Sequence, residues 1–132
     1  MEIRPNTSSQ EIRSPEQPNF DFESLSERIG GDMELLRELV DILDEECPSM
    51  LSAIERAVRE GNAGDLQRAS HKMKGSVLQF SARKAAAIAG TLEEMGSRGS
   101  LEGAAQEYSR LETEITSLLE GLKLVVPGTA AL

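Results

Sequence analysis

The last third of the chain carries an apolar repeat that fits an α-helix and no other regular structure. From Leu101 to Leu122 the apolar positions advance by alternating steps of three and four residues. This alternation follows the 3.6-residue helical turn and places every member on one stripe. The stripe consists of Leu101, Ala104, Tyr108, Leu111, Ile115, Leu118 and Leu122. We therefore predict a last helix that Ser100 opens and that buries this stripe.

Helical periods also fill the chain upstream, and no strand pattern competes with them. A short helix follows Ser24, which forms a capping box with Glu27. Asp32 caps a long second helix whose apolar stripe continues through Pro48. Because proline removes one backbone hydrogen bond and clashes with the preceding turn, we expect one helix bent near Pro48. Two abutting helices are the alternative.

Polar capping residues and glycines separate the remaining helices. Gly61 ends the second helix and Asn62 caps the third, with Asp65 in its first turn. Ser81 is expected to cap the fourth helix, and residues 96–99 are expected to form the loop before the last one.

The composition favours helices packed on helices, since aromatic residues make up only 3% of the chain and tryptophan is absent. Short loops force successive helices to run antiparallel. We predict an all-α fold, an antiparallel up-down-up-down four-helix bundle over residues 20–122 with a short extra N-terminal helix. Residues 1–19 read as a disordered leader and residues 123–132 as a loose tail.

The charge balance limits the possible partners. The formal net charge is −9, from 23 acidic and 14 basic residues, which argues against nucleic acid as a partner. No apolar run approaches the roughly 18 residues needed to span a bilayer, and no secretory signal is present. Cys47 is the only cysteine and falls on a core stripe. We expect a cytoplasmic monomer without membrane contact.

His71 is the only histidine in the chain and lies on the third predicted helix. At about 100° per residue it falls about 140° from the centre of that helix's core stripe. The same exposed strip carries Gln67, Lys74, Gly75 and Leu78. An exposed neutral imidazole is a good nucleophile toward an activated phosphoryl group, although a lone histidine on a helix is most often an ordinary surface residue.

Three further features of this strip favour function. Gly75 stands mid-helix, where glycine costs roughly 1 kcal/mol relative to alanine, and would clear space beside the imidazole. Leu78 is apolar on a face that should be hydrated. Residues 66–84 contain five basic residues and no acid, which would attract an acidic partner: Arg68, Lys72, Lys74, Arg83 and Lys84.

These residues resemble the histidine-containing phosphotransfer domains of multistep two-component phosphorelays. The family pattern is Ala-His-x-Leu-Lys-Gly-Ser/Ala, then an apolar residue and Gly-Ala. The chain reads Ser70-His71-Lys72-Met73-Lys74-Gly75-Ser76, then Phe80-Ser81-Ala82. Upstream, Ile29-Gly30-Gly31-Asp32 and Glu60-Gly61-Asn62 are also similar, so the resemblance covers about residues 20–122. The chain departs from the pattern at Ser70, Met73 and Ser81.

The resemblance implies a phosphocarrier without kinase or hydrolase machinery. His71 would take a phosphoryl group from one receiver-domain aspartate and give it to another, and Lys74 would offset phosphate charge. The docking surface would include Gln67, Arg68, Lys72, Gly75 and Leu78, with magnesium supplied by the receiver and no cofactor of the chain's own. The runner-up is a helical module that binds receivers without carrying phosphate. An enzyme proper is disfavoured, because the chain lacks a Gly-x-x-x-x-Gly-Lys loop and a plausible zinc ligand set.

Overall fold

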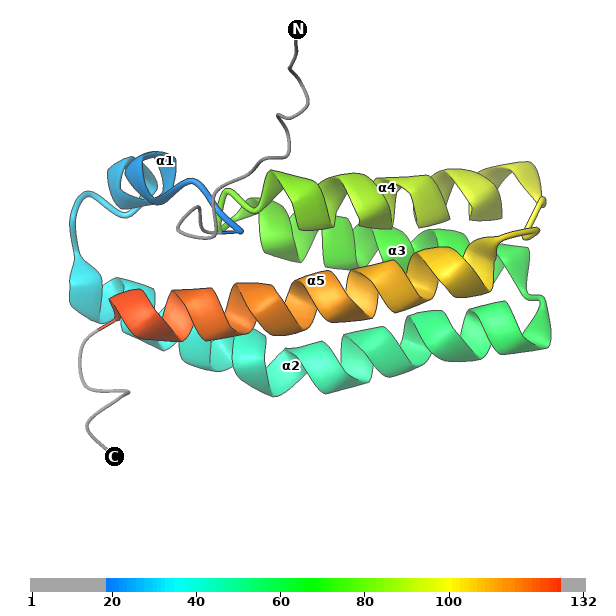
Figure 1. Cartoon of the computed structure of the whole chain (residues 1–132), viewed down its shortest axis with the longest axis horizontal. Helices are drawn as coiled ribbons and strands as arrows, with labels where there is room; N and C mark the ends of the chain where they lie inside the picture. Colours follow the sequence, from blue (N-terminus) through cyan, green and yellow to red (C-terminus); the bar gives the residue numbers. More distant parts are fainter. Residues whose placement is uncertain (1–18, 127–132) are drawn as a thin grey trace, which may run out of the picture.

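The computed structural model describes residues 19–126, and this part of the chain is all-helical with no strand. Figure 1 shows the long helices lying side by side, with the short first helix at one end. The helices are α1 (Phe22–Arg28), α2 (Met33–Glu60), α3 (Ala63–Leu78), α4 (Arg83–Arg98) and α5 (Ala104–Val125). The all-α class is confirmed. The expected leader, apart from residue 19, and residues 127–132 of the expected tail lie outside the described residues.

The second helix is continuous through Pro48, so the prediction of one helix is confirmed. Figure 1 shows its ribbon changing direction near the middle. Pro48 is exposed, while the predicted stripe is buried on the opposite side. The helix ends at Gly61, whose φ of 66° is a left-handed conformation that glycine adopts without strain.

The start of α1 corrects one prediction. Asp21, not Ser24, is the N-cap, and its side chain accepts a hydrogen bond of 3.1 Å from the backbone N–H of Ser24. Ser24 is therefore inside the first turn, and the predicted capping box with Glu27 is wrong. The hydroxyl of Ser24 instead accepts a hydrogen bond of 2.9 Å from the hydroxyl of Ser81.

The connection between α3 and α4 corrects a second prediction. Ala82 occupies the N-cap position of α4, and no side chain caps this helix. Ser81 has φ 56°, which is left-handed. The predicted cap at Ser81 is wrong because the chain reverses there in a conformation that turns its hydroxyl toward Ser24.

The ends of the last two helices also differ from the predictions. The fourth helix runs through Gly96 and ends at Gly99 (φ 71°), so most of the predicted loop 96–99 is helical. The fifth helix begins after Gly103, whose φ of 86° is not helical, and Ser100 does not open it. It continues to Val125, so residues 123–125 of the expected tail are helical; Val126 is buried at 6% exposure, whereas Leu124 is 80% exposed.

The third and fourth helices lie against each other over most of their length. Gly96 on α4 lies beside the backbone of Ala63 and Gln67, whereas Gly90 lies beside Lys74. As residue numbers increase along α3, the numbers of the α4 residues that they contact decrease. This register decides which residues of α4 lie near His71.

Candidate functional site

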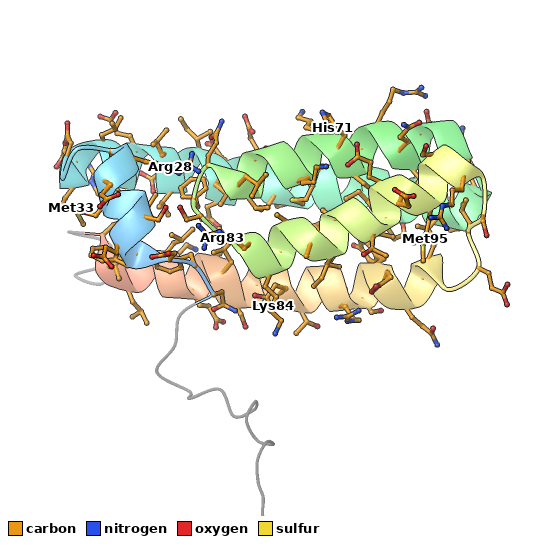
Figure 2. All side chains as sticks on the ribbon, turned by 90° about the horizontal axis from the view of Figure 1, so that it is seen from above. Arg28, Met33, His71, Arg83, Lys84 and Met95 are labelled. Carbon is orange, nitrogen blue, oxygen red and sulfur yellow. The ribbon has the colours of Figure 1, made fainter. Side chains whose placement is uncertain are left out.

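His71 lies on the outer face of α3, and 71% of its side chain is exposed (Figure 2). The start of this helix is determined locally. Asn62 is its N-cap, and its side chain accepts a hydrogen bond of 3.0 Å from the backbone N–H of Asp65. Leu66, Met73 and Val77 then bury the opposite face. The ring is therefore held on a rigid element while its edge stays open to solvent.

The imidazole of His71 and the ammonium of Lys74 share one carboxylate, that of Glu93 on α4. The Nδ1 of His71 is 2.8 Å from Oε2 of Glu93, and the Nζ of Lys74 is 2.7 Å from Oε1. The hydrogen bond from Lys74 lowers the pKa of Glu93 most, and the hydrogen bond to His71 lowers it further, while burial opposes them. Glu93 is therefore an ionised acceptor at neutral pH.

This acceptor determines the tautomer of the neutral ring. An ionised carboxylate can only accept hydrogen bonds, so we assign the imidazole proton to Nδ1. In a neutral imidazole with the proton on Nδ1, the other nitrogen, Nε2, carries the lone pair. The arrangement can thus present an uncharged nucleophile to a partner.

A family model of the Hpt domain matches residues 38–121, which is more than half of the chain and includes His71, Lys74 and Glu93. The chain belongs to the Hpt domain family. No curated protein matches the chain, and no solved structure does. Membership confirms the resemblance and connects the chain to phosphotransfer in two-component signalling. Hpt domains are phosphocarriers rather than classical enzymes.

The other predicted residues of this Hpt domain lie along the exposed side of α3. Gln67, Arg68 and Lys72 are exposed, and Leu78 is 39% exposed. No atom lies within 4 Å of the position that a Cβ on Gly75 would take. Lys74 differs from the rest, since it is half-buried. Within the described residues only His71 and Lys74 are brought together, through Glu93.

Residues 66–84, which contain five basic residues and no acid, are less positive in the fold than the sequence indicates. Four of the five basic side chains form ion pairs with carboxylates. The pairs are Arg68 with Asp65 of the same helix, Lys74 with Glu93 of α4, Arg83 with Asp21 (the N-cap of α1) and Lys84 with Glu114 of α5. Lys72 has no ion pair within residues 19–126. Carboxylates from outside the segment thus offset most of the positive charge that residues 66–84 carry.

Two departures from the family pattern lie directly beside the histidine. Met73 is completely buried, as an apolar residue at that position should be. Ser70 is also completely buried, and its hydroxyl has no hydrogen-bond partner among the described residues. Both substitutions therefore fit the core by size, while Ser70 buries an unsatisfied polar atom.

Glu93 is the functional residue that sequence reasoning missed. It follows Leu92, a core residue of α4, and it is one of the two acids on that helix. Nothing local distinguishes it from Glu94. Only the pairing of α3 with α4 shows that Glu93 is the acid that reaches His71.

The remaining reactive groups do not form a second site in the described part of the Hpt domain. Cys47 is buried, and burial, aided by the charges of Asp44 and Glu46, raises the pKa of its thiol to about 11. No group of three or more His, Cys, Asp or Glu residues between positions 19 and 126 could hold a metal ion. None of the helices described is long and apolar enough to cross a membrane.

Proposed function

We propose that His71 accepts a phosphoryl group from the phosphorylated aspartate of one receiver domain and passes it to the aspartate of another. The observation that carries this proposal is the exposed imidazole with Nδ1 held by Glu93. Receiver domains of response regulators or hybrid histidine kinases are the partners, and they supply the magnesium.

The transfer needs no proton movement. The lone pair on Nε2 attacks phosphorus, the bond between phosphorus and the aspartate oxygen breaks, and the carboxylate leaves with the electron pair. The ring then carries a positive charge, which the hydrogen bond from Nδ1 to Glu93 stabilises. Transfer to the next receiver is the reverse reaction with a new carboxylate as nucleophile.

Lys74 offsets the negative charge of the phosphoryl group. Its ammonium has three hydrogens, so it can donate to a phosphoryl oxygen and still hold Glu93. Gly75 leaves room for the receiver's active site, and Leu78 with Gln67, Arg68 and Lys72 completes the docking surface.

We also propose the helix arrangement, the oligomeric state and the compartment that the sequence predicts. The four long helices form an antiparallel up-down-up-down bundle, and the carrier acts as a cytoplasmic monomer with no nucleic acid and no membrane as partner. The buried, unpaired thiol of Cys47 supports a reducing compartment.

Phosphotransfer from a labelled receiver tests the acceptor. A receiver carrying radiolabelled aspartyl phosphate is expected to label the wild-type chain and not the His71→Gln variant, whose fold is checked by circular dichroism. Equal labelling of both proteins would rule out His71 as acceptor. Tight receiver binding without labelling of the wild type would favour the alternative, a module that binds receivers without carrying phosphate.

Replacement of Lys74 tests the charge role. We expect Lys74→Ala to slow transfer about tenfold, the effect of one lost charge-assisted hydrogen bond to the phosphoryl group. Rates are measured in single-turnover transfer from the same receiver. Lys84→Ala is the control, because Lys84 also pairs with a carboxylate but lies at the start of α4, away from His71 (Figure 2). Equal rates for the two variants would remove Lys74 from the mechanism.

A further inference from the structure

Gly96 is a helical residue that leaves no room for a side chain. It is buried in α4, and a Cβ added to it would lie 2.5 Å from the backbone N of Gln67 and 2.7 Å from the backbone O of Ala63. Both neighbours are backbone atoms of α3, so no side-chain rotation can relieve the contact. The two helices would have to separate by at least about half an ångström before the shorter contact reached 3.0 Å.

This close contact lies one turn away from the histidine site on both helices. On α4, Glu93 precedes Gly96 by three residues, and on α3, His71 follows Gln67 by four. Glu93 spans the gap between the helices to reach both His71 (2.8 Å) and Lys74 (2.7 Å). A separation of half an ångström would lengthen these two contacts to about 3.3 and 3.2 Å, at the upper end of the normal range, where hydrogen bonds weaken.

We propose that Gly96 is a positioning residue for the phosphotransfer at His71. Its missing side chain lets α4 approach α3 closely enough for Glu93 to hold the imidazole proton on Nδ1. Because this role presupposes the proposed function, its test includes a readout that needs no phosphoryl transfer.

Gly90 provides a matched control within the same helix. It also faces α3, but a Cβ there would lie 3.6 Å from Cδ of Lys74, an ordinary van der Waals distance. Alanine favours a helix over glycine at both positions. A difference between the two alanine variants therefore reports the helix–helix contact and not helix propensity.

The single histidine makes a direct measurement possible. In tag-free protein, the two ring ¹⁵N chemical shifts report which nitrogen carries the proton. The wild type and Gly90→Ala are expected to show the Nδ1-protonated form, and Gly96→Ala a mixture of tautomers. Transfer from a phosphorylated receiver is expected to fall about tenfold in Gly96→Ala, as for one lost charge-assisted hydrogen bond, and to stay unchanged in Gly90→Ala.

A double-mutant cycle separates positioning from a general loss of packing. If Gly96 acts through Glu93, then Gly96→Ala lowers the rate in the wild-type background and has no further effect in a Glu93→Ala background. A wild-type tautomer and rate in Gly96→Ala, or an equal loss of rate in both backgrounds, overturns the proposal. A wild-type tautomer in Gly96→Ala defeats the positioning role and leaves the proposed function standing, whereas labelling of His71→Gln defeats the proposed function and, with it, the role of Gly96 in the transfer.

If Gly96→Ala does not fold, Glu93→Asp tests the step on which the proposal depends, the hold of Glu93 on the imidazole. It withdraws the carboxylate by one methylene group without changing the contact between the helices. The tautomer mixture and the loss of rate are then expected in this variant, and wild-type behaviour would overturn the proposal.

Discussion

Ser81 is the one non-glycine residue with a positive φ among residues 19–126. Its value of 56° places a Cβ close to the following carbonyl, which costs roughly 1–2 kcal/mol in a residue other than glycine. The hydrogen bond that its hydroxyl donates to the hydroxyl of Ser24 offsets part of this conformational cost. The family has glycine here, and the structure gives a physical reason for that preference.

Two substitutions at Ser81 separate backbone strain from the hydroxyl bond. Both Ser81→Gly and Ser81→Ala remove the hydroxyl, but only glycine removes the strain. We expect the glycine variant to have a free energy of unfolding about 1 kcal/mol above that of the alanine variant, measured by urea denaturation. The same pair at Gly75, an exposed interior position of α3, should show the opposite order, with alanine more stable by about 1 kcal/mol. Alanine being the more stable at both positions would refute the strain at Ser81.

At the scale of the helices, the apolar stripes and the N-cap at Asn62 were predictable because they depend on nearby residues. The stripes of α2 and α3 are buried as predicted, and His71 is exposed as the helical angle indicates. The stripe predicted for the last helix is buried except at Leu101, which precedes α5, and Tyr108, both of which are partly buried. The helix ends were less predictable. Gly96 has the local character of a helix stop, yet it is a contact glycine inside α4, and only the partner helix reveals this.

The site was predictable from the sequence only where its residues lie on one helix. His71, Lys74 and Gly75 share one helix, so their spacing places them on one strip. Glu93 joins them from another helix, and its contribution depends on the register between α3 and α4. A sequence without a structure does not give that register.

The contact of Glu93 with α3 also predicts a pH dependence of stability. The pKa of Glu93 is lowered in the folded protein, mainly by the hydrogen bond from Lys74. A lowered pKa means stabilisation that is fully present above the ordinary carboxyl value of 4.5 and is lost as the pH falls through the folded-state pKa. We therefore expect wild type to be more stable than Glu93→Gln at neutral pH, and the difference to shrink below about pH 4.5. Urea denaturation across this range checks the prediction, and a difference that does not change with pH would contradict it.

At the scale of the molecule, residues 19–126 combine one largely aliphatic core with one reactive strip. The core extends beyond the matched family region, because Phe20 and Leu25 are buried in it. The backbone N–H of Asp21 donates to the carbonyl of Ser81 (3.1 Å), and this bond ties the start of α1 to the connection that follows α3. The C-terminal end of the helix that carries His71 is thus connected to α1, while the imidazole itself remains exposed. This division fits a carrier that must stay rigid while different partners dock on it.

The position of the phosphoryl group on the ring tests this account most directly. After transfer from a phosphorylated receiver, ³¹P and ¹⁵N NMR spectra of the single histidine identify the nitrogen bonded to phosphorus. We expect phosphorus on Nε2 of His71 with a proton retained on Nδ1 toward Glu93. Phosphorus on Nδ1, or on any other side chain, would contradict it.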